Sequence, residues 1–382
     1  MTFSSKLPWV GTTIFTQMSQ LAQSQQAINL AQGFPDFPAE SQLLLALNQH
    51  VLAGQNQYAP MPGVLALRQQ IATLTARCYG VLPDPEHEIT VTSGATEAIF
   101  VAIQAVVRAG DEVIIFDPAY DSYQPAIALA GGVTVHIQLG APDFRINWNE
   151  VAAKITNKTR LIIVNSPHNP TGVVFDSSDW QALATLVQQY NLFCISDEVY
   201  QHIIFEPAQR QSAVQYAGLR ERCFIVSSFG KTFHVTGWKL GYCLAPASLT
   251  TELRKIHQYV TFSSFTAAQY AIADVLAQSP QLVDAVAVDY QQKRDTFANL
   301  LEPSKFQLLP CAGTYFQVVD YSELSALPDV EFCHWLTCEH KVAAIPLSVF
   351  SKQPSADKLI RLCFAKSNTT LEHAAEWLCQ IN

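Results

Sequence analysis

Short apolar runs alternate with helical patterns from about residue 90 to residue 245, and this alternation restricts the possible folds of the chain more than any other feature. Several runs are continuously apolar, which is typical of strands buried on both faces. Helical patterns lie between most of them, so the sequence predicts an α/β fold with a mostly parallel sheet flanked by helices. We expect strands at residues 112–116, 133–139, 161–164, 192–195, 223–226 and 240–244, and a helix at 95–107.

The pattern changes near residue 280, which indicates a second, smaller α+β domain. A long helix is expected at 281–301 and strands at 316–320 and 359–364. The sequence Asp176-Ser-Ser-Asp179 can cap a helix that ends near Tyr190, and Thr369-Thr-Leu-Glu372 reads as a capping box for the last helix. We therefore predict a large domain at residues 40–279 and a small domain formed by residues 1–39 and 280–382.

Charge and cysteine usage argue against several classes of protein. The net charge of −9 disfavours a nucleic-acid-binding face. The nine cysteines are odd in number and form no Cys-x-x-Cys pair, so we expect reduced thiols and no metal site. The most apolar helical run, residues 98–107, is too short to span a bilayer, so no membrane association is expected. These features predict a cytoplasmic protein.

Polar side chains gather where the expected strands end. Asn165 follows the run at 161–164, Asp197 follows the run at 192–195, and Ser228 and Lys231 follow the run at 223–226. Ligands bind at the carboxyl ends of the strands in parallel sheets. The convergence of these distant segments predicts one active site. Three more polar residues follow the run at 112–116: Asp117, Tyr120 and Tyr123.

Lys231 stands in a position that is unusual for an ordinary lysine. Desolvation at a buried strand end disfavours the charged ammonium, and a neutral amine can attack an aldehyde to form a Schiff base. Ser228 and Lys239 could then hold the phosphate of the same cofactor. On this segment alone, the alternative is a surface loop with two ordinary lysines. The other strand-end residues favour the active site.

Several motifs together make the chain resemble the class I aminotransferases, the fold type I enzymes that use pyridoxal 5′-phosphate and share the aspartate aminotransferase fold. The resemblance runs from about Leu7 to the C-terminus. Within the family it is closest to the branch of methionine aminotransferase and glutamine transaminase K (kynurenine aminotransferase). The motifs are Gln32-Gly-Phe-Pro-Asp-Phe37, Asn56-Gln-Tyr-Ala-Pro60, Thr92-Ser-Gly-Ala-Thr-Glu97, Asp117-Pro-Ala-Tyr-Asp-Ser-Tyr123, Asn165-Ser-Pro-His-Asn-Pro-Thr-Gly172, Ser196-Asp-Glu-Val-Tyr200, the segment around Lys231, and Ile360-Arg-Leu-Cys-Phe364.

The resemblance implies a role in cofactor binding for many of these residues. Lys231 matches the Schiff-base lysine, which also moves a proton between the substrate and the cofactor. Asp197 matches the aspartate that faces the pyridine nitrogen. Tyr200 and Asn169 match the partners of the ring O3′, although Asn169 also stands in a good turn sequence. The remaining cofactor contacts implied are Gly94, Ala95, Thr96, Ser228 and Lys239 for the phosphate, Tyr120 for stacking on the ring, and Tyr58 from a neighbouring subunit for the phosphate.

Other matches concern the substrate. Arg361 matches the arginine that binds the substrate α-carboxylate, with Asn165 and the backbone of Gly33 as further contacts. Phe15, with Tyr58 and Phe262 of a partner, would line the side-chain pocket, so the resemblance implies a homodimer with shared sites. The alternatives are ordinary: a surface arginine, a core tyrosine at position 120, an ordinary helix start at Gly94, and aromatic residues that only fill a dimer interface. In many relatives arginine occupies the position of Lys239.

The preferred hypothesis is an aminotransferase that moves the amino group of a large uncharged amino acid, such as methionine, glutamine or an aromatic one, to a 2-oxo acid. A pyridoxal-phosphate-dependent cysteine-conjugate β-lyase is the second hypothesis, because the same site can eject a β-leaving group. A ligand-sensing regulator of the same fold is the third. The chain has no basic face, which argues against it.

Overall fold

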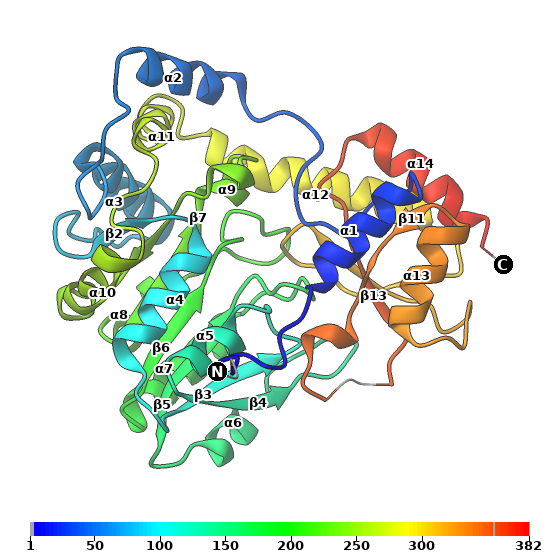
Figure 1. The fold of residues 1–382 in the computed structure, drawn as a ribbon, viewed down its shortest axis with the longest axis horizontal. Helices are drawn as coiled ribbons and strands as arrows, with labels where there is room; N and C mark the ends of the chain where they lie inside the picture. Colours follow the sequence, from blue (N-terminus) through cyan, green and yellow to red (C-terminus); the bar gives the residue numbers. More distant parts are fainter. Residues whose placement is uncertain (1–3, 354–355, 382) are drawn as a thin grey trace.

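A seven-stranded sheet forms the centre of the computed structural model, which describes residues 4–353 and 356–381 (Figure 1). The strand order is β2-β8-β7-β6-β5-β3-β4, and β8 runs antiparallel to both of its neighbours while the others pair in parallel. The sheet therefore confirms the predicted mostly parallel α/β fold. Its strands are β2 (Ile89–Thr92), β3 (Glu112–Asp117), β4 (Val133–Gln138), β5 (Thr159–Asn165), β6 (Phe193–Asp197), β7 (Cys223–Ser228) and β8 (Gly241–Leu244).

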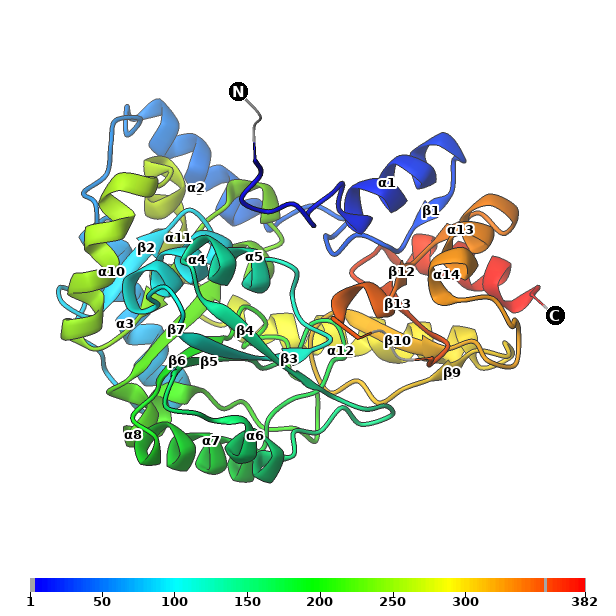
Figure 2. The ribbon, with the colours of Figure 1, turned by 60° about the horizontal axis from the view of Figure 1, so that its bottom comes forward.

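Helices cover both faces of this sheet (Figure 2). On one side lie α4 (Ala95–Val106), α5 (Tyr123–Leu129) and α10 (Ala247–Val260); on the other lie α6 (Trp148–Lys154), α7 (Ser177–Gln189) and α8 (Ala217–Arg220). Successive strand residues alternate between two cores: Val113 and Ile115 pack with α4, and Ile114 packs on the opposite side. Burial on both faces explains why the strands read as continuous apolar runs.

The smaller part of the molecule contains two further sheets. One is antiparallel, in the order β12-β13-β10-β9, and the other pairs β1 with β11 in parallel. A strand from before residue 30 thus pairs with a strand from after residue 306, as the predicted small domain requires. The domain boundaries at 39/40 and 279/280 stay a prediction. The strands are β1 (Ile28–Asn29), β9 (Gln307–Leu308), β10 (Phe316–Asp320), β11 (Val342–Ala343), β12 (Ile345–Pro346) and β13 (Leu359–Cys363).

Some of the remaining helices lie beside the large sheet and the others lie beside the two smaller sheets (Figure 1). The helix α12 runs from the large sheet toward the small one, and its bounds agree with the predicted helix at 281–301. The helices are α1 (Ile14–Ser24), α2 (Ser41–Leu52), α3 (Leu65–Tyr79), α9 (Phe229–Thr232), α11 (Thr266–Gln278), α12 (Leu282–Leu301), α13 (Asp329–Glu339) and α14 (Asn368–Cys379), with short 3₁₀ turns at Ala213–Gln215, Thr236–Trp238 and Ser348–Phe350.

Two helix starts test the predicted caps. The side chain of Asp176 accepts hydrogen bonds from the backbone N–H groups of Ser178 and Asp179, so the predicted cap of α7 is confirmed. The predicted capping box at Thr369 is wrong, because α14 begins at Asn368 and Ser367 is its N-cap. A carboxylate that is distant in the sequence, that of Asp36, stabilises this helix start. Asp36 accepts from the N–H of Ser367 and from the hydroxyl of Thr370.

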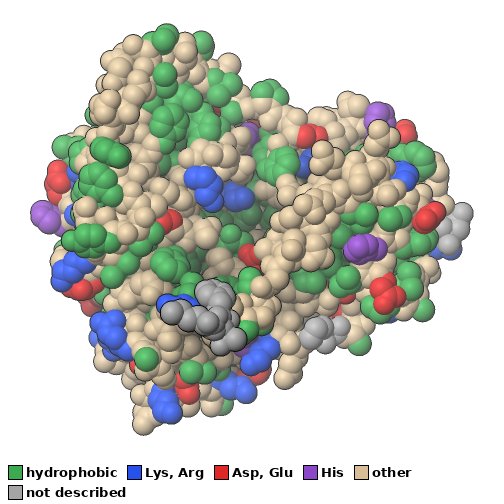
Figure 3. All heavy atoms as spheres, in the orientation of Figure 1, with side chains coloured by type: hydrophobic (Ala, Val, Ile, Leu, Met, Phe, Trp, Pro, Cys, Tyr) green, Lys and Arg blue, Asp and Glu red, His purple; other side chains and the backbone are tan. Residues whose placement is uncertain are grey.

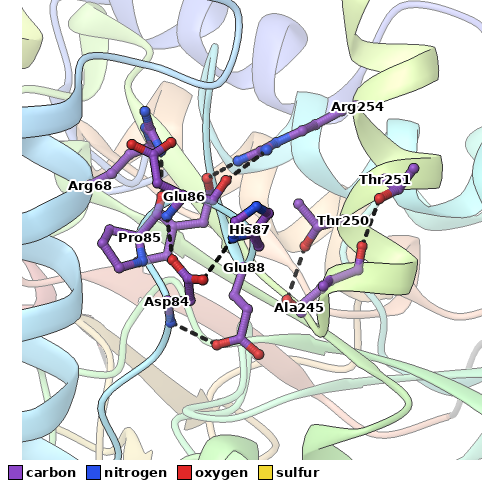
Figure 4. A network of polar contacts seen from close by, with 12 residues as sticks. Arg68, Asp84, Pro85, Glu86, His87, Glu88, Ala245, Thr250, Thr251 and Arg254 are labelled. Atoms are coloured by element: carbon purple, nitrogen blue, oxygen red, sulfur yellow. Dashed lines mark hydrogen bonds and ion pairs between the residues drawn. The ribbon is translucent and has the colours of Figure 1, made fainter.

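The edge strand β2, which the sequence did not predict, is held by two arginines. Arg254 from α10 donates to the carbonyl oxygens of Glu86 (2.9 Å) and Ile89 (2.7 Å), and Arg68 from α3 donates to the Glu86 carboxylate (3.0 Å) (Figure 4). The two bonds from Arg254 satisfy backbone carbonyl groups at the exposed edge of the sheet. They also fix the strand that leads into Gly94, at the start of α4.

The described residues contain no helix long and apolar enough to cross a membrane. In the same part of the chain, no group of three or more His, Cys, Asp and Glu side chains could hold a metal ion. All nine cysteines are free thiols.

Candidate active site

A cavity of about 220 Å³ lies where β5, β6 and β7 end, and a hollow is visible between the two parts of the molecule (Figure 3). It brings together most of the residues that the sequence nominated. Two of them, Tyr58 and Phe262, are not in its lining. The nominated residues that line it are Phe15, Gly33, Gly94, Ala95, Thr96, Tyr120, Asn165, Asn169, Asp197, Tyr200, Ser228, Lys231, Lys239 and Arg361.

Lys231 lies on α9, a single turn that directly follows β7. Its Nζ donates a hydrogen bond to the hydroxyl oxygen of Tyr315 at 2.8 Å. Burial lowers the pKa of Lys231 to about 8, and the positive charges of Arg361 and Lys239 act in the same direction. At pH 7 about a tenth of the molecules therefore carries a neutral, nucleophilic amine, far more than for an ordinary lysine.

Asp197 is the last residue of β6 and points into the same cavity. Its carboxylate accepts a hydrogen bond from the hydroxyl of Tyr123 at 2.5 Å and from the N–H of Val199 at 3.3 Å. Burial raises the pKa of Asp197 to about 6, and the bond from Tyr123 offsets part of this effect. No particular role was predicted for Tyr123, and the structure makes it the hydrogen-bond partner of this carboxylate.

The N-terminus of α4 faces a lysine across a very small space. Gly94 precedes the helix with φ of 82°, a conformation that favours glycine. A Cβ atom there would lie 3.5 Å from Nζ of Lys239 and 3.4 Å from its Cε. Free backbone N–H groups of the first turn, the positive end of the helix and an ammonium group thus converge on one point, as an anion-binding site requires. Ser228 ends β7 beside it.

Tyr120 follows β3 and lines the cavity with Thr96. Its hydroxyl lies 3.2 Å from the Thr96 Oγ1, and its ring packs edge-on against Tyr123 at 5.6 Å between centroids. The two tyrosines are thereby fixed relative to α4 and to Asp197.

Arg361 on β13 brings a buried guanidinium into the cavity from the smaller sheet. It donates to the Asn169 Oδ1 at 2.7 Å and to the Ala31 carbonyl at 3.1 Å, and its Cζ lies 3.8 Å from the ring centre of Phe316. Its Nε is buried and has no hydrogen-bond partner among the described residues. The alternative of a surface arginine is therefore excluded.

Asn165 lies behind Asn169 rather than beside the guanidinium. Its Nδ2 donates to the backbone oxygen of Asp197 at 2.8 Å, and its Oδ1 accepts from the N–H of Asn169 at 2.8 Å. Asn165 thus links the ends of β5 and β6 to the turn that carries Asn169. The amide closest to Arg361 is that of Asn169.

Tyr200 and two residues that the sequence did not single out, Tyr315 and Phe316, form an aromatic wall. The centroid of the Tyr200 ring lies 5.1 Å from that of Tyr315 and 5.9 Å from that of Phe316. Burial raises the pKa of Tyr200, so its hydroxyl stays neutral. The only sequence signal near Tyr315 and Phe316 is the apolar pattern at 316–320. This pattern predicts a strand but does not indicate a functional site.

Tyr58 and Phe262 pack against each other at 5.5 Å between ring centroids, outside the cavity of their own chain. The side chain of Tyr58 is 83% exposed. Their predicted contribution to the site of a partner subunit stays a prediction.

With this geometry in place, comparison with known proteins identifies the family. The profile of the family "Aminotransferase class I and II" matches residues 25–378. The chain belongs to this family, and the prediction of an aminotransferase is confirmed.

Individual relatives cover the whole chain. It is 56% identical to the methionine aminotransferase of Escherichia coli over 99% of this chain and 98% of that protein. The crystal structure of YbdL from Escherichia coli, for which a methionine aminotransferase function was identified, superimposes with a TM-score of 0.97 at 56% identity and full coverage of both chains. Kynurenine–oxoglutarate transaminase 1 of Mus musculus is 32% identical over 97% of this chain and 94% of its own length. The resemblance to this branch is confirmed.

Proposed function

We propose that this chain is a pyridoxal-phosphate-dependent aminotransferase that takes the amino group from a large uncharged amino acid, methionine first, and passes it to a 2-oxo acid. The observation that carries the proposal is one cavity that holds the amine of Lys231, the Asp197 carboxylate, an anion-binding helix start and the guanidinium of Arg361.

The anion-binding end of the cavity suits a phosphate. Lys239 and the first N–H groups of α4 meet at Gly94, where even a methyl group would come within 3.5 Å of the Lys239 Nζ. Ser228 supplies a hydroxyl. Lysine at position 239 binds as a point charge rather than as a fork, so its presence in place of arginine is compatible with phosphate binding.

The other end of the cavity suits a pyridine ring. Asp197, with a pKa of about 6, is ionised at neutral pH and would face a ring nitrogen; Tyr123 holds it in place. Tyr120 would cover the ring, and Tyr200 and Asn169 would contact its O3′. When bound, pyridoxal phosphate supplies an aldehyde that condenses with amines and a ring that draws electrons from the substrate Cα.

Lys231 would move the proton. Its neutral amine takes a proton from the substrate Cα, and the resulting ammonium can return that proton elsewhere. The pKa of about 8 suits both roles near neutral pH, because neither protonation state is strongly disfavoured. The ring centres of Tyr200 and Tyr315 lie 5.6 and 5.5 Å from the Lys231 Nζ, and these rings would help to exclude water from this transfer.

Arg361 would hold the substrate α-carboxylate. Its unpaired Nε and the adjacent Asn169 amide offer donors to one carboxylate, and such a fork fixes orientation. We assign this contact to Asn169 rather than to Asn165, since both ends of the Asn165 amide already bind protein groups. The N–H of Gly33 stays a proposed further contact.

The side-chain preference follows from the cations in the cavity. Those in its described lining are Lys231, Lys239 and Arg361, and each already has a role above. A second carboxylate on the substrate would be buried without a partner, at a cost of several kcal/mol. Phe15 and Phe316 instead offer apolar contact, and sulfur packs well against aromatic rings.

A cytoplasmic homodimer completes the proposal. Tyr58 and Phe262 lie in contact on the surface, and Tyr259 nearby in the sequence is 89% exposed. Exposed aromatic residues of this kind are enriched in subunit interfaces. A partner could receive Tyr58 at its phosphate and Phe262 at its side-chain pocket.

A screen of half-reactions tests the function. The purified holoenzyme is mixed with each amino acid, and loss of the absorbance of the cofactor–lysine linkage is followed. We expect the largest kcat/KM for methionine and aromatic donors, and a ratio of methionine to aspartate far above one. A ratio below one would overturn the side-chain argument and reveal a cation in the pocket. Analysis of products separates the second hypothesis, since a β-lyase releases pyruvate and a thiol from cysteine conjugates.

A further inference from the structure

Tyr315 joins two parts of the site that are far apart in the sequence. Its hydroxyl oxygen accepts a hydrogen bond from the Lys231 Nζ at 2.8 Å, and the same hydroxyl donates to the backbone oxygen of Gly33 at 2.7 Å. The chain of contacts therefore runs from the reactive amine to the loop proposed to contact the substrate carboxylate.

The directions of these bonds follow from the groups involved. A carbonyl oxygen only accepts, so the single phenolic proton points to Gly33. The lone pairs of the hydroxyl are left for Lys231, which donates to them. Burial raises the pKa of Tyr315 well above its usual value, with the neighbours Tyr200 and Cys363 acting in the same direction, so the hydroxyl remains neutral. Tyr315 thus orients the amine without taking its proton.

The position of Tyr315 is rigid. Its ring is fully buried and packs against Phe316 (4.8 Å), Tyr200 (5.1 Å) and Tyr290 (5.5 Å). The Gly33 backbone lies so close to this cluster that a Cβ at that position would come 2.6 Å from the Phe316 ring and 3.3 Å from the Tyr315 ring. Movement of the loop and movement of the hydroxyl are therefore tied together.

We propose that Tyr315 is a positioning residue for Lys231: its hydroxyl holds the amine whenever this amine is not joined to the cofactor, and it links that state to the Gly33 loop. The inference rests on the proposed function for its catalytic meaning. During turnover Lys231 has to leave the cofactor and act as a free base. An acceptor at a fixed place keeps the free amine inside the cavity in one orientation. This reduces the conformational freedom that the amine must lose before it can take the substrate proton.

The hydrogen bond also affects the ionisation of the amine. An acceptor stabilises an ammonium more than a neutral amine, because hydrogen bonds to charged groups are the stronger ones. Burial, Arg361 and Lys239 lower the pKa of Lys231, while Cys363 and Asp197 raise it. Loss of the Tyr315 hydroxyl shifts this balance toward the neutral amine.

The test compares Tyr315→Phe with Tyr290→Phe. The Tyr290 hydroxyl is buried and has no hydrogen-bond partner among the described residues, although its ring belongs to the same cluster. Each variant loses one hydroxyl and keeps its ring, so Tyr290→Phe is the matched control for packing.

The first measurement does not depend on activity. The full-length chain without cofactor is treated with acetic anhydride at a series of pH values, and acetylation of Lys231 is quantified by peptide mass spectrometry. We expect the midpoint of the reactivity profile to fall by about one pH unit in Tyr315→Phe, the difference between a charged and a neutral hydrogen bond, and to stay unchanged in Tyr290→Phe. An unchanged midpoint in Tyr315→Phe would overturn the proposal, whatever reaction the enzyme catalyses.

The second measurement uses the holoenzyme. We expect kcat of Tyr315→Phe for the best donor to fall by about tenfold with a smaller change in KM, and that of Tyr290→Phe to remain near the wild type. Replacement of Tyr315 by 3-fluorotyrosine keeps the fold and weakens the acceptor, so the acetylation midpoint should move the same way by less. Equal losses in both phenylalanine variants would assign Tyr315 a purely structural role. A wild-type enzyme that reacts with no amino acid would contradict the proposed function and leave the acetylation result standing.

Discussion

Asp197 gives a prediction in which stability and function move in opposite directions. In the cofactor-free chain, burial raises the pKa of this carboxyl to about 6 from an ordinary value of 3.8. A raised pKa in the folded state means that stability is fully present below about pH 4 and is lost as the pH rises through 6. Two pH units correspond to about 3 kcal/mol, so the ionised carboxylate destabilises the empty chain by roughly this amount above pH 6.

Asp197→Asn removes the titration and keeps the shape of the side chain. The amide accepts one of the two bonds made by Tyr123 and Val199, and the other is lost at a cost of about 1 kcal/mol. We expect the variant to be more stable than the wild type by about 2 kcal/mol at pH 7.5, and about equally stable at pH 4.5. Cofactor affinity and transamination should both fall, because the ring nitrogen loses its carboxylate.

Urea unfolding of both cofactor-free proteins, at one protein concentration and at several pH values, measures this difference. Tyr123→Phe should steepen the loss of wild-type stability between pH 5 and 7, since its hydroxyl lowers the pKa of Asp197. In the Asp197→Asn background the same change should add no pH dependence. Stability curves for wild type and Asp197→Asn that run parallel from pH 4.5 to 8 would refute the reasoning.

Three further predictions concern the proposed roles. Lys231→Ala keeps the proposed phosphate and ring contacts, so it should still bind pyridoxal phosphate in an absorbance titration but lose transamination by orders of magnitude; normal turnover would reject the assignment. Mixing Tyr58→Phe with Lys231→Ala subunits should create one intact site per heterodimer, so the mixture should be more active than either parent, and a fully active monomer at nanomolar concentration would exclude shared sites. Arg361→Lys exchanges a fork for a point charge and should lower kcat/KM for methionine by about 10- to 100-fold, mainly through KM; an unchanged value would place the carboxylate elsewhere.

The strand ends show why the position of the site was predictable. Asn165, Asp197 and Ser228 are the last residues of β5, β6 and β7, and Lys231 lies one turn later. Apolar runs reveal buried strands, and parallel strands have to present their carboxyl ends at one edge. The sequence therefore predicts that the site lies at the carboxyl ends of the strands, even though it does not predict the order of the strands.

Contacts between distant segments were not predictable in the same way. Tyr315 is 84 residues from Lys231 and 282 residues from Gly33. No periodicity of the sequence encodes such a meeting, which depends on where the fold places the residue before β10 relative to the turn after β7. The bond from Tyr123 to Asp197 and the N-cap of α14 at Ser367 were missed for the same reason, since each depends on a partner from another part of the fold.

The ionisable groups of the cavity share one physical property. Burial is the largest cause of the lowered pKa of Lys231, the raised pKa of Asp197 and the lowered pKa of Arg361. Each group is thus held in a place that disfavours its charged form, and this desolvation lowers the stability of the folded chain. The proposed ligands bring the opposite charges: a phosphate to Lys239, a ring nitrogen to Asp197 and a carboxylate to Arg361. Ligands that bind only the folded state stabilise it in proportion to the logarithm of their concentration. Because Arg361 belongs to the small sheet and Asp197 to the large one, this stabilisation acts on both parts of the molecule, and substrate and cofactor should each raise the stability of the whole chain.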